Sequence, residues 1–127
     1  MKGFEDAAHE LNVSVEFRGA TQYDANKENT VLEQIIAKKP AGIAITAINP
    51  QALNVMIDKA VKAGIPIVLF DSGAPDSKAY SCLGTDNYSA GAQAAREFGR
   101  LMMGEGQAAV VTQPNQLNHE ERNSGVV

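Results

Sequence analysis

Apolar residues along this chain recur at two spacings, one typical of helices and one typical of strands. In residues 2–11 they recur at i, i+3, i+4 and i+7, with acidic side chains on the opposite side, which predicts an amphipathic helix. The helical spacing returns in three longer segments. Their predicted caps are Asp24, Asn49 and either Asp86 or Asn87, and they end before Pro40, Gly64 and Gly104. In the last of them, Phe98 and Leu101 are expected to face the core.

Short apolar runs separate these helices and predict strands. Residues 13–17 alternate strictly between apolar and polar side chains, which indicates a half-buried strand near the edge of a sheet. Further strands are expected at residues 42–47, 67–70, 80–83 and 108–112. The run at 67–70 contains no polar residue, so we expect both of its faces to be covered.

The alternation of helices and strands predicts an α/β fold with a doubly wound, mostly parallel sheet and right-handed crossovers. The order begins with a helix, although the first strand of such a sheet is normally central. We therefore expect that a first strand is missing from this sequence. The segment Gly104-Glu105-Gly106 is the best candidate for a linker.

Composition and charge exclude several classes of function. The 127 residues suffice for one core but not for two full-sized lobes. A net charge of −4 without a dense cluster of Lys or Arg argues against a nucleic-acid surface. No His or Cys cluster has the spacing of a metal site, and the lone Cys82 is expected in the core. No apolar run approaches the ~20 residues of a membrane span.

The sequence also lacks the common motifs of catalysis and cofactor binding. It has no Gly-x-Gly-x-x-Gly after a strand, no phosphate-binding P-loop and no Gly-x-Ser-x-Gly elbow. No Ser or Cys nucleophile has a matching partner that could act as its base. We therefore expect neither enzymatic activity nor a cofactor.

Asp71 is the first candidate for ligand binding because it follows the apolar strand at 67–70. In open parallel sheets, ligands bind outside the carboxyl ends of the strands. A carboxylate at that place can accept hydrogen bonds from neighbouring hydroxyls, as a sugar or polyol requires. The alternative interpretation is that the Asp71 carboxylate caps the turn at Ser72 and Gly73.

Asn118 and Arg122 are the second candidate. If a helix starts near Asn118, the two residues are four apart and share one face. An amide and a guanidinium would then point to the same ligand. The alternative interpretation is a capped first helical turn with an exposed ion pair.

Several motifs, taken in order, resemble those of a known family. The run at 60–68 with Ala63-Gly64-Ile65-Pro66 is followed by Asp71-Ser72 and by Gly84-Thr85-Asp86-Asn87, while Asn49-Pro50 and Glu121-Arg122 fit the same order. This pattern covers essentially the whole chain and resembles the type I periplasmic sugar-binding proteins of ABC transporters. The ribose-binding proteins are the closest comparison, and the cores of LacI-type repressors share the fold.

The resemblance implies a sugar site that is shared by two lobes. Asp71 would be the aspartate of the first lobe that binds sugar hydroxyls, and Arg122 the arginine of the second lobe that binds the same sugar. Asn118 would match a polar sugar contact of hexose-binding relatives. Ser72 would stand beside the ligand at a place where ribose-binding proteins commonly have an arginine, so we expect a sugar other than ribose.

The resemblance also implies a division of the chain. Residues 1–103 would form an incomplete, flavodoxin-like first lobe, residues 104–107 the hinge, and residues 108–127 the start of the second lobe. Relatives begin with a strand and an aromatic loop and continue through a second lobe, and we expect most of these parts to be missing here. One incomplete lobe cannot close over a ligand, so the chain alone should bind weakly or undetectably.

The leading hypothesis is a non-catalytic receptor that binds a monosaccharide or related polyol and serves the membrane permease of an ABC-type importer. The full-length protein would then be periplasmic, or extracellular with a lipid anchor. The alternative is the effector-binding core of a LacI-type transcription regulator in the cytoplasm. A third alternative is a half-domain without ligand that forms a homodimer, with the 108–112 strand exchanged between copies, since unpaired strand edges recruit partners.

Overall fold

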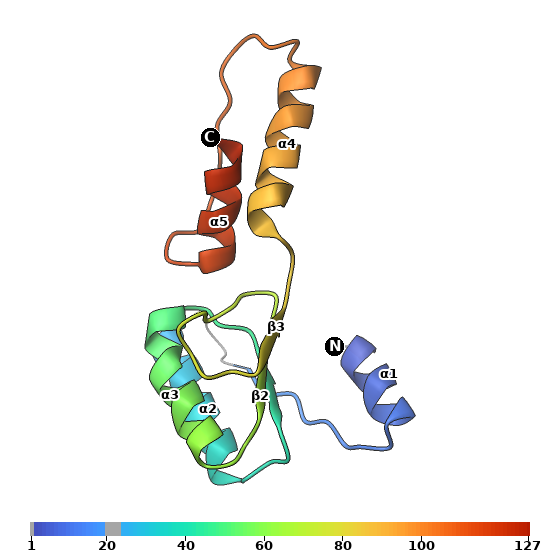
Figure 1. The fold of residues 1–127 in the computed structure, drawn as a ribbon, viewed down its shortest axis with the longest axis vertical. Helices are drawn as coiled ribbons and strands as arrows, with labels where there is room; N and C mark the ends of the chain where they lie inside the picture. Colours follow the sequence, from blue (N-terminus) through green and yellow to red (C-terminus); the bar gives the residue numbers. More distant parts are fainter. Residues whose placement is uncertain (1, 20–23) are drawn as a thin grey trace.

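The computed structural model describes residues 2–19 and 24–127, which form both helices and short strands (Figure 1). The elements are α1 (Lys2–Glu10), α2 (Ala25–Ala37), β1 (Ile43–Ile45), α3 (Pro50–Lys62), β2 (Ile67–Phe70), β3 (Ser81–Leu83), α4 (Asn87–Leu101) and α5 (Leu117–Val126). This order confirms the predicted α/β class. None of the helices in these two ranges combines the length and the apolar character that crossing a membrane requires.

The three strands form one parallel sheet in the order β1-β2-β3. Ile43 of β1 is paired with Ile67 of β2, and Phe70 of β2 is paired with Leu83 of β3. The pairing continues past the strand ends, because the Asp71 N–H donates to the Leu83 carbonyl at 2.9 Å. The residues that follow the three strands therefore lie at one edge of the sheet, the edge at which parallel α/β folds bind ligands.

The core lies between the sheet and the helices α2 and α3, which cover one of its faces (Figure 1). Its largest fully buried apolar side chains are Leu32, Leu53, Ile57 and Ile67. Helix α1 lies on the opposite face, where the Phe4 and Phe70 ring centroids are 5.2 Å apart. This face is only partly covered, because α4 leaves the sheet and packs along α5. Val68 is consequently 36% exposed, and the prediction that both faces of β2 are covered is wrong.

Side chains at the start of three helices confirm the predicted caps. Asp24 and Asn49 each accept a hydrogen bond from a backbone N–H of the following turn, at 2.8 and 3.1 Å. Asp86, rather than Asn87, caps α4 and accepts from the Ser89 N–H at 2.9 Å. Because each cap satisfies a backbone donor that has no partner within its own helix, these three starts are set by local sequence.

Two of the predicted strands are absent from the structure. Residues 13–17 and 108–112 are described but pair with no other strand of the described chain, and Val111 is 98% exposed. A strand forms only where a neighbour offers its backbone groups, and local alternation of side chains does not supply that neighbour. The exchange of residues 108–112 between two copies stays a prediction.

Three side chains that were predicted to face the core are exposed. Phe98 and Leu101 are exposed because α4 does not pack on the sheet, and no other described element covers this side of the helix. Cys82 is exposed because β3 is an edge strand whose three residues are all accessible to solvent. These predictions are therefore wrong, and each failed because the expected covering element lies elsewhere.

Glu28 joins α2 to the loop that follows β1. Its carboxylate accepts a hydrogen bond from the Ile48 N–H at 3.1 Å. Burial raises the pKa of Glu28 from its ordinary value of 4.5 to about 7, and the hydrogen bond from Ile48 opposes this shift only in part. The folded chain therefore holds the Glu28 proton more tightly than the unfolded chain does. As a result, Glu28 makes the fold less stable as pH rises from 4.5 to about 7.

The substitution Glu28→Gln is expected to remove this pH dependence. Glutamine keeps an oxygen acceptor for the Ile48 N–H but carries no charge that burial would penalise. The variant should match the wild type near pH 4.5 and unfold at a higher temperature than the wild type above about pH 7. Thermal unfolding across this pH range measures the effect, with Glu105→Gln as a control at an exposed loop position. A less stable Gln variant at high pH would contradict the raised pKa.

Candidate functional site

The chain turns sharply where β2 ends, and Asp71 lies at this turn. Its backbone is left-handed, with φ of 63°, a conformation that Asp tolerates better than most non-glycine residues. Its carboxylate has no hydrogen-bond partner in the described part of the chain. The alternative interpretation, a cap for the turn at Ser72 and Gly73, is therefore wrong. Gly84 allows the chain after β3 to approach, since a Cβ there would lie 3.0 Å from the Asp71 carbonyl oxygen.

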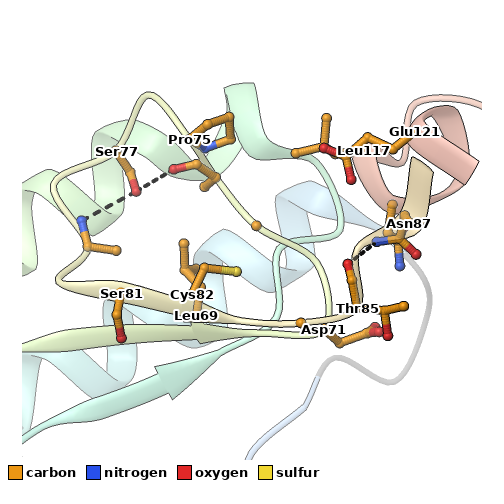
Figure 2. Close-up of a pocket in the computed structure, with 15 residues that line it drawn as sticks. Leu69, Asp71, Pro75, Ser77, Ser81, Cys82, Thr85, Asn87, Leu117 and Glu121 are labelled. Carbon is orange, nitrogen blue, oxygen red and sulfur yellow. Dashed lines mark hydrogen bonds between the residues drawn. The ribbon is translucent and has the colours of Figure 1, made fainter. Parts of the chain in front are cut away.

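A cavity of about 430 Å³ opens at this edge of the sheet (Figure 2). Its wall comes from the end of β2, the loop at 73–79, β3, the start of α4 and the first turns of α5. In Figure 2, Leu117 and Glu121 approach from α5, while Asp71 and Thr85 lie together below them. The volume falls within the roughly 300–1,000 Å³ of small-molecule sites.

Asn118 lies in the wall of the same cavity as Asp71, as is expected if both residues bind one ligand. It stands in the first turn of α5 and is 8% exposed. Its Oδ1 atom has no hydrogen-bond partner among the described residues. A buried acceptor that lacks a donor costs about 1–3 kcal/mol, so a ligand that donates a hydrogen bond to this oxygen would be stabilised.

Arg122 does not line the cavity but is hydrogen-bonded to a residue that does. Its Nη2 atom donates to Oδ1 of Asn87 at 2.5 Å, and Asn87 in turn lines the cavity. Asn118 and Arg122 are both in α5 and four residues apart, as predicted, but only Asn118 forms part of the wall. Helix α5 thus places Asn118 in the cavity wall, whereas Arg122 is connected to the wall only through its hydrogen bond to Asn87.

Ser72 is not brought to the cavity. The residue is 2% exposed, and its Oγ atom has no hydrogen-bond partner in the described chain. Its N–H donates to the Phe70 carbonyl at 2.8 Å, and its carbonyl accepts from the Ala47 N–H at 3.2 Å. These contacts join the turn after β2 to the loop after β1. The role of Ser72 beside a ligand stays a prediction, and its position in the core does not favour it.

The sequence did not predict five polar residues of the wall as ligand contacts, namely Ser77, Ser81, Thr85, Asn87 and Glu121. Thr85 and Asn87 lie within four residues of the end of β3, so the rule that led to Asp71, applied to the next strand, would have found them. The wall offers carboxylate, amide and hydroxyl groups, which suit a neutral ligand with several hydroxyls. No group of three or more His, Cys, Asp or Glu that could hold a metal ion occurs within residues 2–19 and 24–127.

Known proteins are similar to this chain in both fold and sequence. The family model described as the periplasmic binding protein domain matches residues 1–127. The sugar-binding protein of a sugar ABC transporter from Bacillus halodurans is 66% identical over 98% of the chain, with a TM-score of 0.91. AraP, an arabinose-binding protein from Geobacillus stearothermophilus, is 67% identical over 99%, with a TM-score of 0.86. An ABC transporter solute-binding protein from Burkholderia graminis in complex with D-arabinose is 28% identical over 98%, with a TM-score of 0.95.

The chain spans less than half the length of these relatives. It covers 43% of the proteins from Bacillus halodurans and Geobacillus stearothermophilus and 44% of the one from Burkholderia graminis. None of the curated proteins matches the chain. The similarity therefore extends over nearly all of this chain but over a minor part of each relative.

Proposed function

Since this chain belongs to the periplasmic binding protein domain family, we propose that it supplies part of a monosaccharide site in the receptor of an ABC-type sugar importer. The receptor binds the sugar, or a related polyol, without chemical reaction and needs neither a cofactor nor a metal. The ligand occupies the cavity of about 430 Å³ at the edge of the sheet.

The observation that carries this proposal is a pair of unpartnered acceptors in one cavity. The Asn118 Oδ1 atom is buried without a donor, and the Asp71 carboxylate has no hydrogen-bond partner among the described residues. Sugar hydroxyls can donate to both groups and can accept hydrogen bonds in return. A neutral polyol would satisfy these acceptors without bringing a further charge into a cavity that Asp71 and Glu121 already line.

Arabinose is the first candidate among monosaccharides. AraP, whose name describes an arabinose-binding protein, is 67% identical to this chain, and the Burkholderia graminis relative was solved with D-arabinose. This choice agrees with the expectation that the ligand is not ribose, which was based on Ser72 in place of an arginine. A pentose that differs from ribose in the orientation of its hydroxyls is therefore the ligand class that we propose.

We also propose that the chain contributes to two lobes, with residues 1–103 in the first, residues 104–107 as the hinge and residues 108–127 in the second. The cavity wall supports this division because Asp71 comes from the first segment and Asn118 from the last. Gly104 and Gly106 have φ of 76° and 100°, a backbone conformation that glycine adopts without strain. As an importer's receptor, the protein acts outside the cytoplasmic membrane, held there by a lipid anchor or free in the periplasm, and delivers its sugar to a permease.

Titration of this chain with a panel of sugars tests the proposal. The panel contains both enantiomers of arabinose, with xylose, ribose, glucose, galactose and a linear polyol. Because binding by this chain is expected to be weak, NMR shifts of labelled protein are a better readout than calorimetry. We expect saturable shifts at Asp71 and Asn118 with arabinose and smaller ones with ribose. The absence of saturable shifts with every sugar, or selective binding of ribose, would contradict the proposal.

A further inference from the structure

The side-chain amide of Asn87 is held at both ends. The residue is 4% exposed, and its Nδ2 atom donates to the Thr85 carbonyl at 3.1 Å. Its Oδ1 atom accepts from Nη2 of Arg122 at 2.5 Å. Because Asn87 lies in the cavity wall, this contact connects the guanidinium of Arg122 to the wall, although Arg122 itself does not line the cavity. Asn87 therefore links the turn after β3 to a charged group on α5.

Close approach of the two helix backbones accompanies this contact. Gly91 of α4 lies against Arg122, since a Cβ at residue 91 would come within 2.9 Å of the Arg122 carbonyl carbon. Gly125 of α5 lies in the same way against Tyr88, whose carbonyl carbon would be 3.0 Å from an added Cβ. The two glycines let α5 pack directly on the first turns of α4. The base of the Arg122 side chain is thereby placed next to the residue that accepts its hydrogen bond.

Asn87 is not needed to cap the helix that it begins. Asp86 already performs that task through the Ser89 N–H at 2.9 Å. The buried Asn87 side chain is instead directed to Thr85 on one side and Arg122 on the other. The contact with Arg122 joins residues 35 apart in sequence, so it serves the arrangement of the site rather than local helix structure.

We propose that Asn87 is a positioning residue for Arg122 and thereby a determinant of monosaccharide affinity. This inference rests on the proposed function. Asn87 uses one of the five N–H donors of the guanidinium, and those that remain can donate to hydroxyl or ring oxygens of a sugar. Arg122 then supplies donors to a ligand whose hydroxyls donate to Asp71 and to Oδ1 of Asn118.

Two substitutions at residue 87 separate positioning from a merely structural role. Asn87→Ala removes the acceptor for Arg122 and the donor to Thr85, whereas Asn87→Asp replaces the donor by a second oxygen, adds a negative charge and keeps the acceptor. NMR titration of this chain with arabinose should show about tenfold weaker binding for Asn87→Ala, the usual effect of losing a hydrogen bond to a charged group. Asn87→Asp should lose less affinity than Asn87→Ala, because it keeps the acceptor for Arg122.

The side-chain NMR signals of Arg122, assigned by their loss in Arg122→Lys, provide a readout that does not depend on sugar. We expect distinct guanidinium signals in the wild type and in Asn87→Asp, and averaged signals in Asn87→Ala, because only the first two hold the group in place. Equal loss of binding in both variants at residue 87, or unchanged Arg122 signals in Asn87→Ala, would overturn the proposal. If the wild type binds no sugar, the proposed function fails, and the Arg122 signals alone decide whether Asn87 positions this group.

Discussion

Asp71→Asn is expected to weaken monosaccharide binding by about 10- to 100-fold, since a hydrogen bond to a charged group contributes about 1.5–3 kcal/mol. The carboxylate has no hydrogen-bond partner among the described residues, so it is available to accept hydrogen bonds from a ligand. Asparagine tolerates the left-handed backbone at this turn at least as well as aspartate does, which keeps the fold intact. Titration with arabinose, followed by NMR, measures the loss, and circular dichroism checks the fold.

Asp76→Asn is the matched control for this experiment. Asp76 is an exposed carboxylate in the loop after β2, five residues from Asp71, and it does not line the cavity of about 430 Å³. Its substitution changes the net charge by the same amount and should leave binding unchanged. Equal losses in the two variants would indicate a general electrostatic effect and would contradict a direct role of Asp71.

Gly91→Ala is expected to separate α5 from α4. A methyl group at residue 91 would overlap the Arg122 carbonyl, and overpacking of this kind costs roughly 1–3 kcal/mol or forces the helices apart. Amide hydrogen exchange should then become about tenfold faster, or more, throughout α5 while the protection of β2 and α3 is unchanged. Arabinose binding should fall in parallel, because Asn118 lines the cavity only while α5 is docked.

Gly99→Ala is the control, because Gly99 belongs to the same helix and a Cβ there meets no atom within 4 Å. Replacing glycine by alanine inside a helix stabilises it by about 0.5–1 kcal/mol, so this variant should unfold at a higher temperature than the wild type. Both substitutions therefore raise helix propensity equally, and only one of them introduces a steric conflict. Unchanged exchange in α5 of Gly91→Ala would contradict the close packing of the two helices.

The sequence predicted the helices well because their signals are local. Asp24, Asn49 and Asp86 cap helices whose apolar spacing can be read within a few turns of chain. The wrong predictions concern contacts between residues that are far apart in sequence. Residues 13–17 alternate as a strand does, yet they pair with no strand in the described part of the chain. The exposure of Cys82 and Phe98 likewise depends on where other elements pack, which local pattern does not encode.

The candidate site could be predicted only in part, for the same reason. Asp71 was found because parallel strands bring their carboxyl ends to one edge, and Asn118 because its spacing from Arg122 fits a helix face. The role of Asn87 depends on a contact between α4 and α5 across 35 residues, so no local motif reveals it. Ser72 was chosen as the neighbour of Asp71, but the turn directs it into the core.

The backbone of Asp71 implies a conflict between heat resistance and ligand recognition. A left-handed φ of 63° costs a non-glycine residue about 1 kcal/mol, and the two residues that best relieve this cost are glycine and asparagine. Neither has a carboxylate. Selection of random variants for thermostability alone would therefore enrich both substitutions at residue 71 and yield robust chains that no longer hold a sugar. Any stabilised version of this chain should accordingly be selected with its ligand present.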